Sequence, residues 1–255
     1  MNQSVAKALR LLQFFTPERP RLTLAEISRL SGLSKPTAYR LLKALEEEGF
    51  LARNSIDHED KQYQLGLRLF ELGNLVAEQL EVRKIARPYM ERLRDEVNEV
   101  VHLVILDRGH AVYVERVEND RPMSLFTRIG LRTPLYVGSA PRLLLAYMEE
   151  TEREEILRQM KLQPYTEATI TDPAELRKVL EEIRNRGYSI SYGEHVPGTL
   201  GLSVPIRDHT GSVIASLTIA IPGHNFTSEQ IEYLIAKLKQ TAREISRKCG
   251  FSENE

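Results

Sequence analysis

Between Ser34 and Lys43 the chain carries closely spaced hydroxyl and cationic side chains. Lysine and arginine bind phosphates and guanine edges, hydroxyl groups bind phosphates, and small methyl groups contact the methyl group of thymine. Leu41, Leu42 and Leu45 recur at helical spacing in the same stretch, so the polar side chains are left for the outer face of a helix. This face is predicted to contact DNA through Ser34, Lys35, Thr37, Ala38, Tyr39, Arg40 and Lys43. Tyr39 has an alternative place at the rim of the core.

Two helices joined at Gly32 are predicted to position these side chains. The second helix begins at Ser34, a favourable N-cap, has Pro36 in its first turn and ends before Gly49. The first helix has apolar residues at helical spacing, namely Leu24, Ile27 and Leu30. A helix-turn-helix places its second helix in the DNA major groove. Two short helices joined by glycine also occur in many other all-α proteins, so the motif alone leaves that alternative open.

A small hairpin is predicted directly after these helices. Phe50–Arg53 and Lys61–Leu65 have the composition of strands, and a polar loop at 54–60 joins them. Such a hairpin is the wing of a winged helix, in which Arg53 and Lys61 contact phosphate. The acidic loop tip suits DNA poorly, so we expect that part of the hairpin only to close the core. An earlier helix with an apolar stripe of Val5, Ala8, Leu9, Leu12 and Phe15 completes a module over residues 1–65.

Composition and charge fit a cytoplasmic protein of two domains. The 255 residues carry a net charge of −1. Residues 1–65 hold 10 basic and 8 acidic side chains against 25 and 28 in the rest, so the positive side of a small asymmetry falls on the predicted DNA-binding module. Cys249 is the only cysteine, which excludes an internal disulfide. No apolar run is long enough for a membrane span or a signal peptide, and no membrane partner is expected.

Residues 66–81 are predicted to form a linker helix that is apolar over much of its circumference. Its apolar residues are Leu67, Leu69, Phe70, Leu72, Leu75, Val76 and Leu80. Such a helix needs partners on more than one side, and packing against its copy in a second subunit satisfies that need.

Residues 82–255 are predicted to form an α+β domain. Antiparallel strand pairs alternate with groups of helices, which is typical of that fold class. Strands are expected at 101–106, 111–117, 123–129, 200–207 and 212–221. Helices are expected at 82–97, 140–148, 152–160, 173–186 and 228–248.

The whole chain resembles the IclR family of bacterial transcriptional regulators. The N-terminal traces of the resemblance are Ser34–Leu42 and Glu47–Phe50, and the C-terminal ones are Gly130–Leu135, Gly187-Tyr188 and Gly201–Gly211. The resemblance implies a winged helix-turn-helix domain at 1–65, a linker helix at 66–81 and a GAF-like effector-binding domain at 82–255. It also implies dimers or tetramers, a palindromic or near-palindromic operator in double-stranded DNA, and a small-molecule effector such as an organic acid or aromatic metabolite.

The family's effector pocket, transferred to this chain, comprises Leu125, Ser139, Ala140, Ser191, Gly201, Thr218 and Ala220. Ser139 is expected to cap a helix whose first N–H groups bind a carboxylate. Ordinary helix capping and strand packing are the alternatives for these residues. Pro141-Arg142 departs from the Gly-Lys usual in the family, so the effector of another member is not transferred.

An enzyme is the rival class. The six histidines show no metal-ligand spacing, and no nucleophile or phosphate-loop motif occurs. Glu194-His195 is the one pair considered for a metal or acid–base role, against a polar loop at the pocket edge. We therefore expect no catalytic residue, metal or cofactor. The alternative function is a small-molecule-binding or enzymatic GAF-like protein without specific DNA binding. The effector, the operator, the choice between repression and activation, and the choice between dimer and tetramer stay open.

Overall fold

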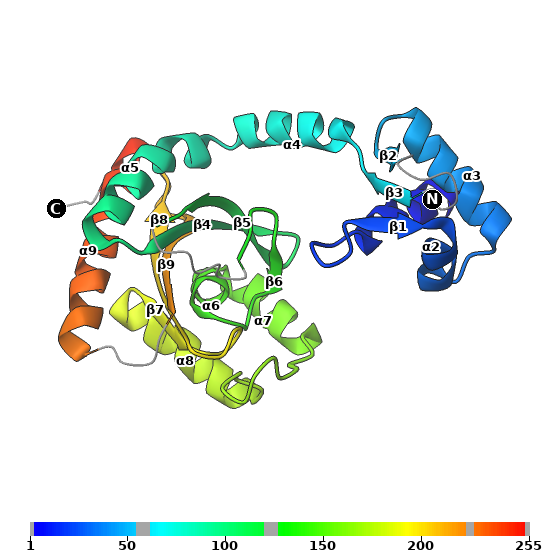
Figure 1. The fold of residues 1–255 in the computed structure, drawn as a ribbon. Coiled ribbons are helices and arrows are strands. Elements are labelled where there is room, and N and C mark those ends of the chain that lie inside the picture. Colours follow the sequence, from blue (N-terminus) through cyan, green and yellow to red (C-terminus); the bar gives the residue numbers. More distant parts are fainter. Residues whose placement is uncertain (1–2, 55–61, 120–126, 223–226, 253–255) are drawn as a thin grey trace. The chain divides into compact units, whose positions relative to one another are not determined.

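The computed structural model describes residues 3–54, 62–119, 127–222 and 227–252, and Figure 1 labels their helices and strands. The chain forms two compact units, residues 1–79 and 80–255. Each unit has its own hydrophobic core. No helix in the described ranges is both long and apolar enough to cross a membrane.

The first unit is a winged helix. It contains α1 (Gln3–Leu11), a short 3-10 turn η1 (Leu12–Phe14), β1 (Arg21–Thr23), α2 (Leu24–Ser31), α3 (Lys35–Glu47), β2 (Leu51–Asn54) and β3 (Gln62–Leu65). The strands form an antiparallel sheet in the order β1-β3-β2, so the predicted wing hairpin is confirmed. Strand β1 was not predicted, because three residues are too few to show an alternating pattern.

The turn between α2 and α3 has the predicted glycine in a left-handed conformation. Gly32 follows α2 with φ of 67°, a value that side chains with a Cβ rarely adopt. Thr23 and Glu26 form a capping box at the start of α2, which stabilises that end of the helix. Apolar residues of all three helices and the sheet, including Ile27, Leu42 and Tyr63, meet in one small core.

The apolar stripe predicted for α1 is wrong in part. Leu11 and Phe15 are buried, whereas Val5 and Leu9 are about half exposed, at 54% and 52%. The buried face is therefore centred on Leu11, and the tighter turn η1 alters the angular step between that face and Phe15.

Helix α4 (Leu67–Gln79) follows the wing and has no buried residue. Its beginning is tied to the end of α3, because the Gly66 N–H donates to the Phe50 carbonyl and a Cβ at Gly66 would lie 2.1 Å from the Gly49 oxygen. Among its apolar residues, Leu67, Phe70, Leu75 and Val76 are exposed. The helix thus presents an apolar surface that nothing in its own unit covers.

The second unit is built on a six-stranded antiparallel sheet in the order β6-β5-β4-β9-β8-β7. The strands are β4 (Val100–Asp107), β5 (His110–Val117), β6 (Arg132–Pro134), β7 (Ser189–Tyr192), β8 (Thr199–Arg207) and β9 (Val213–Pro222). The helices are α5 (Glu81–Val97), α6 (Ser139–Ala146), α7 (Glu150–Gln159), α8 (Pro173–Arg186) and α9 (Ser228–Lys248). This arrangement confirms the predicted α+β class.

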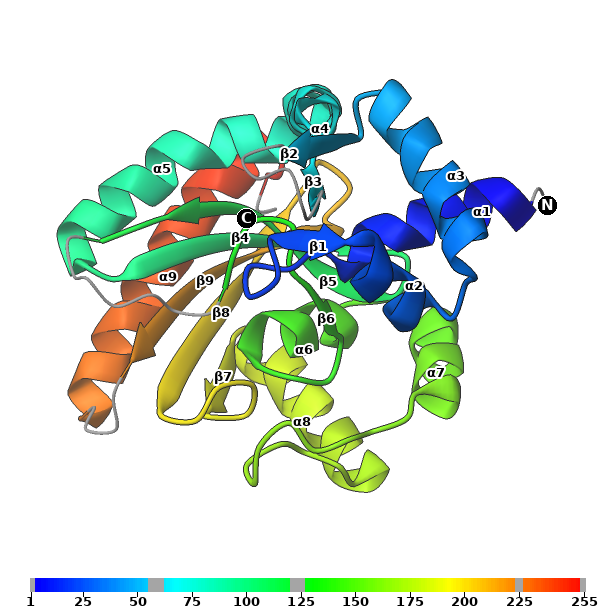
Figure 2. The same ribbon diagram turned by 45° about the vertical axis from the view of Figure 1, so that its right-hand side comes forward.

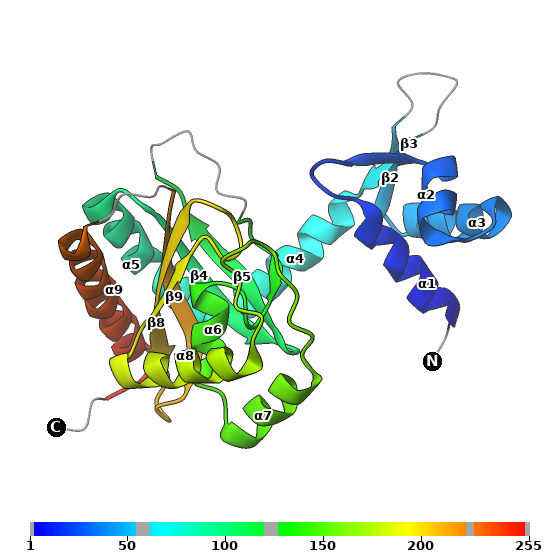
Figure 3. The same cartoon turned by 90° about the horizontal axis from the view of Figure 1, so that it is seen from below.

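Helices cover both faces of the sheet. Helices α5 and α9 lie against one face (Figure 2), and α6 and α8 lie on the other (Figure 3). Alternation along β4 assigns its side chains accordingly, since Leu103 packs in the core with α5 and α9, and Val104 packs in the core with α6 and α8. His102 has the same parity as Val104, so it faces the α6 side.

The predicted strand at 123–129 is not seen as a strand where the chain is described. Residues 123–126 lie outside the described ranges, and 127–129 have no strand pairing. Strands β6 and β7, which the sequence analysis missed, are short strands at the two edges of the sheet. Short edge strands show little alternation of polar and apolar residues, so they are identified only from their pairing with a neighbouring strand.

Candidate DNA-binding and effector sites

The exposed face of α3 carries most of the side chains predicted to contact DNA. Lys35, Arg40 and Lys43 are exposed, and Tyr39 is 43% exposed. Ser34 is the N-cap residue, but its hydroxyl donates to Thr37 Oγ1 at 2.9 Å rather than accepting a backbone N–H. Lys43 lies 3.5 Å from the Glu47 carboxylate in an exposed ion pair. Exposed cations are therefore concentrated at the start and middle of the helix, and its acidic residues at the end.

Ala38 does not belong to this face, and its predicted DNA contact is wrong. Its exposed fraction is 0%, and it lies one helical turn before Leu42, which is equally buried. Ala38, Leu42 and Leu45 share one side of α3 because four- and three-residue steps keep the same face. That spacing was visible in the sequence.

Arg53 is also engaged inside the protein, which weighs against its predicted role as a phosphate contact. Its guanidinium donates to Glu46 Oε2 at 2.8 Å and to the Tyr63 hydroxyl at 3.2 Å. The guanidinium carbon also lies 5.2 Å from the centre of the Tyr63 ring. Arg53 thus joins the wing to the end of α3. Lys61, the other predicted wing contact, lies outside the described residues.

A small, partly open cavity of about 60 Å³ lies between the sheet and the start of α6. It brings together five of the seven predicted effector residues, Ser139, Ser191, Gly201, Thr218 and Ala220, from α6, β7, β8 and β9. Antiparallel register explains this meeting, because Gly201 is opposite both Ser191 and Ala220. Leu125 lies outside the described residues.

Buried hydroxyl groups form a chain beside this cavity. Ser203 Oγ donates to Ser139 Oγ at 2.8 Å and lies 2.8 Å from Thr218 Oγ1. Thr218 Oγ1 in turn lies 3.1 Å from Ser216 Oγ. Because a hydroxyl can both donate and accept, this chain can reorient its hydrogens to suit either a donor or an acceptor on a ligand.

Two details of the predicted pocket are wrong. Gly138, with φ of 90°, is the N-cap of α6, and Ser139 is the first helical residue. Ala140 does not line the cavity; its methyl group is 1% exposed and packs in the core. A helix entered through glycine orients Ser139 toward Ser203, so its hydroxyl does not cap the helix.

Gly201 sets the size of the cavity. A Cβ at this position would lie 2.6 Å from Ser139 Oγ and 3.4 Å from Ser139 Cβ. The first distance is too short for any real contact and the second is at the lower limit of van der Waals contact, so only glycine leaves the cavity and the Ser139 hydroxyl undisturbed.

His102 is a cavity residue that the sequence analysis missed. Its side chain is fully buried, its Nε2 lies 2.7 Å from Thr127 Oγ1, and its ring meets Tyr113 edge-on at 5.4 Å. Burial, with a smaller effect of the Arg116 charge, lowers the pKa of His102 to about 3, so the imidazole is neutral. Its Nδ1 has no hydrogen-bond partner among the described residues. The available signal was a polar residue at an inward position of the otherwise apolar strand β4.

Glu194 and His195, considered for a metal or acid–base role, lie in different environments. The Glu194 carboxylate is buried and lies 2.7 Å from the Arg142 guanidinium, while His195 lines the cavity. Burial raises the pKa of Glu194 and lowers the pKa of His195. Among the described residues, no three histidine, cysteine or acidic side chains are close enough to hold a metal ion.

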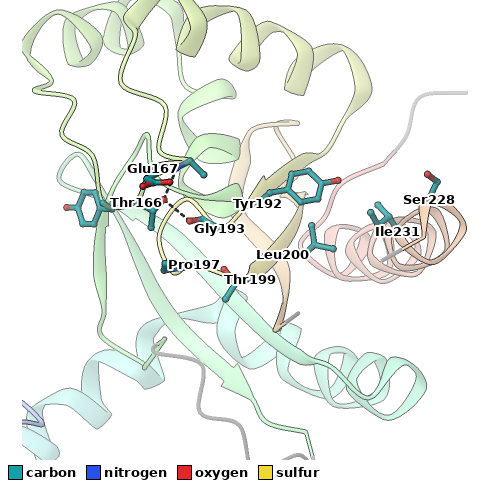
Figure 4. Close-up of a pocket in the computed structure, with 12 residues that line it drawn as sticks. Thr166, Glu167, Tyr192, Gly193, Pro197, Thr199, Leu200, Ser228 and Ile231 are labelled. Atoms are coloured by element: carbon teal, nitrogen blue, oxygen red, sulfur yellow. Dashed lines mark hydrogen bonds between the residues drawn. The ribbon is translucent and has the colours of Figure 1, made fainter. Parts of the chain in front are cut away.

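A second, more open pocket of about 770 Å³ lies next to this cavity, and Figure 4 shows residues that line it. It is lined by the segment before β8 and by Ser228 and Ile231 of α9. The two hollows share Thr199 and Leu200, but none of the predicted effector residues lines the open one.

A winged helix with an exposed basic recognition helix, in one chain with an α+β domain whose cavity has hydroxyl and imidazole groups on its wall, defines a DNA-binding regulator controlled by a small molecule. Comparison with known proteins makes this class specific. Residues 4–55 match the IclR helix-turn-helix domain, and residues 74–247 match the C-terminal domain of bacterial transcriptional regulator IclR. The chain belongs to the IclR family of bacterial transcriptional regulators.

Relatives match over nearly the whole chain. The HTH-type transcriptional regulator KipR of Bacillus subtilis is 39% identical, with 98% of each chain covered. KdgR of Escherichia coli is 32% identical over 98% of this chain and 94% of its own. The crystal structure of Thermotoga maritima IclR has a TM-score of 0.79 at 33% identity, covering 98% of this chain and 100% of that one. An IclR homologue of Microbacterium hydrocarbonoxydans in complex with 4-hydroxybenzoate has a TM-score of 0.83 at 30% identity, covering 96% and 98%.

Proposed function

We propose that this regulator binds a palindromic or near-palindromic operator as a dimer, with α3 in the major groove. The observation that carries the proposal is the exposed face of α3, where Lys35, Tyr39, Arg40 and Lys43 have no role in the core. Arg40, one turn into the helix, is assigned to a base edge, and Lys35 at its start to a phosphate. Ser34 and Thr37, whose hydroxyls are already hydrogen-bonded to each other, add phosphate contacts beside Lys35.

The dimer is proposed to form through α4. Its exposed Leu67, Phe70, Leu75 and Val76 give the helix apolar surface on more than one side, and burial of such residues drives association. A two-fold dimer presents two copies of α3 to two half-sites, which explains a symmetric operator. Pairing of two dimers into a tetramer is a further proposal that rests on the family alone.

The effector site is proposed to be the cavity at Ser139, Ser191, Gly201, Thr218 and Ala220, with His102 as an additional contact. Hydroxyl and imidazole groups on its wall suit a small polar ligand, and its limited volume favours a short organic acid. The Microbacterium relative's complex with 4-hydroxybenzoate supports the aromatic alternative, which needs the cavity to enlarge. Effectors of this type typically change affinity for DNA by about 1–3 kcal/mol.

We infer that the protein acts as a regulator rather than an enzyme. Its curated relatives carry the names of transcriptional regulators, which supports this inference. Action on bacterial DNA places it in the cytoplasm.

Footprinting on DNA from around its own gene, at two salt concentrations, tests this function. We expect a protected two-fold symmetric site that survives the higher salt, and at least about a fivefold loss of affinity in Arg40→Ala, since a specific base contact contributes about 1–3 kcal/mol. Lys178→Ala, which removes an exposed cation of α8, is the matched control and should bind like the wild type. Equal loss in both variants would contradict a recognition role for α3.

The effector proposal is tested on the same footprint. Addition of 4-hydroxybenzoate or of short-chain organic acids should shift the half-saturation point of the wild type. An effect that persists unchanged in Gly201→Leu, which fills the cavity, would place the effector elsewhere.

A further inference from the structure

A protein carboxylate occupies the anion-binding position at the start of α6. Glu194 Oε1 lies 2.7 Å from the Arg142 guanidinium, and Oε2 accepts the Gly138 N–H at 3.4 Å. The N-terminus of a helix attracts anions because its first N–H groups are unpaired and the helix dipole is positive there. Gly138 and Ser139 also line the cavity, so this carboxylate lies at its edge.

Arg142 makes this position more than a helix terminus. Its exposed fraction is 2%, and it is among the largest fully buried side chains in the described parts of the chain. It also donates to the Ile190 carbonyl at 2.7 Å, while its Nε has no hydrogen-bond partner within the part of the chain that the structure describes. A guanidinium stays charged in proteins, so burial at this point requires an anion beside it.

Glu194 reaches this position from a connecting segment and not from a helix or strand. Residues 193–198 join β7 to β8, and the Glu194 carbonyl accepts hydrogen bonds from the hydroxyls of Thr166 (3.3 Å) and Thr169 (2.7 Å). The same segment contributes His195 and Val196 to the small cavity, and Gly193 and Pro197 to the open pocket of Figure 4. Glu194 therefore belongs to a segment that borders both hollows, although Glu194 itself lines neither.

We propose that Glu194 is a built-in competitor for an acidic effector. Its carboxylate fills a binding position for a free carboxylate, made by Arg142 and the Gly138 N–H, and an acidic ligand takes that position by displacing Glu194. This inference rests on the proposed function, since it assumes that the adjoining cavity is the effector site. Displacement has to move residues 193–198. Binding of an acidic ligand therefore changes the position of a segment that borders the cavity.

Acetate is the probe that fits the test. Glu194→Ala removes a CH2–COO⁻ group, which corresponds to one acetate ion, and leaves Arg142 buried without its anion. We expect the variant to lose roughly 10 °C of melting temperature, because breaking a buried ion pair on one side is strongly destabilising. Sodium acetate should restore several degrees of this loss, by binding only the folded state, and sodium chloride at equal ionic strength should not. The wild type should need at least about ten times more acetate for the same shift.

Glu154→Ala is the matched control, because it removes a glutamate from the exposed ion pair with Arg177 and creates no buried vacancy. Acetate should not stabilise this variant. The proposal is overturned if acetate stabilises Glu194→Ala no more than the wild type or the control.

Glu194→Gln keeps the test decisive if the alanine variant does not fold. The amide preserves the volume but competes for Arg142 without a charge, so acetate should act at a concentration about tenfold lower than in the wild type. Equal acetate responses of this variant and the wild type would overturn the proposal. These melting curves need no DNA, so failure of the competitor proposal is separate from failure of operator binding in the footprint.

Discussion

Buried polar side chains distinguish the cavity of the second unit from its surroundings. His102, Ser139, Ser203 and Thr218 are all nearly inaccessible, yet they lie between two apolar cores. Burial of a polar group costs free energy unless it is hydrogen-bonded, and no residue in the described ranges bonds to the His102 Nδ1. A ligand that supplies a donor or an acceptor at this nitrogen offsets that cost, which favours the cavity as a binding site.

The pH dependence of stability tests the buried, neutral state of His102. The pKa of His102 is about 3 in the folded protein, against about 6.5 for a free histidine. Below pH 6.5 the imidazole is therefore protonated in the unfolded chain but stays neutral in the folded chain. His102 therefore lowers the free energy of unfolding as the pH falls, by about 2 kcal/mol between pH 7.5 and pH 5. His102→Gln, followed by urea unfolding at both pH values, should lack this component. His110→Gln, at an exposed histidine, should retain it. Parallel pH profiles for the wild type and His102→Gln would show that the imidazole is not held neutral.

At the scale of elements, the charged residues of α3 fall into two groups, cations proposed to bind DNA and acidic residues that bind within the protein. The exposed cations near its start face solvent, while the acidic residues at its end serve the protein itself, with Glu46 bound to Arg53 of the wing. The wing is held to the recognition helix by this ion pair and by Tyr63, which is 2% exposed. The hairpin thus fixes the end of α3 in place.

Arg53→Met tests whether Arg53 has a structural role, in contrast to Arg40, which is proposed to bind DNA. The variant keeps the hydrocarbon part of the side chain but loses the bonds to Glu46 and Tyr63, so we expect a loss of about 1–2 kcal/mol in the free energy of unfolding of the first unit. This pair is partly exposed, at 24% and 29% of the two side chains, which keeps the loss modest. Urea denaturation measures it. Operator affinity at low temperature should stay within about twofold of the wild type, whereas a tenfold loss with unchanged stability would restore Arg53 as a DNA contact.

At the scale of the whole molecule, control of DNA binding depends on how two copies are joined. Helix α4 connects the winged helix to the effector unit in the sequence, and its exposed apolar side chains are the proposed dimer contacts. Two half-sites bind with high affinity only when they are physically linked, because the second contact then forms at a high effective concentration. A ligand that changes the linkage changes occupancy of the operator.

Phe70→Glu tests the dimer. Phe70 is 66% exposed in the isolated chain, and a buried charge at a subunit contact is costly, so the variant should sediment as a monomer at concentrations where the wild type is dimeric. Affinity for a two-half-site operator should fall at least about tenfold. Tyr192→Glu places the same charge at another exposed aromatic residue, 59% exposed, which belongs to the other unit, and should remain dimeric. A dimeric Phe70→Glu would exclude this face of α4 from the interface.

Local sequence signals determined most elements, because they depend on neighbouring residues. Proline and the glycine that follows bound the long helix α8, apolar periodicity predicted α9, and glycine and polar residues marked the hairpin turns. The same signals identified the winged helix and the face of α3 with Arg40. The burial of Ala38 was also predictable from its spacing to Leu42, but the prediction overlooked it.

Only the tertiary structure decided which polar groups meet. Arg142 and Glu194 belong to a helix and to a connection far apart in the chain, Arg53 finds Glu46 across the wing, and His102 reaches the cavity through its strand parity. The sequence shows each of these as an isolated charged or polar residue, for which solvent is the ordinary environment. Pairing across the fold depends on the register of β7, β8 and β9 and on the way α6 begins at Gly138. Those long-range contacts carry no local periodicity, and for that physical reason no sequence pattern reveals them.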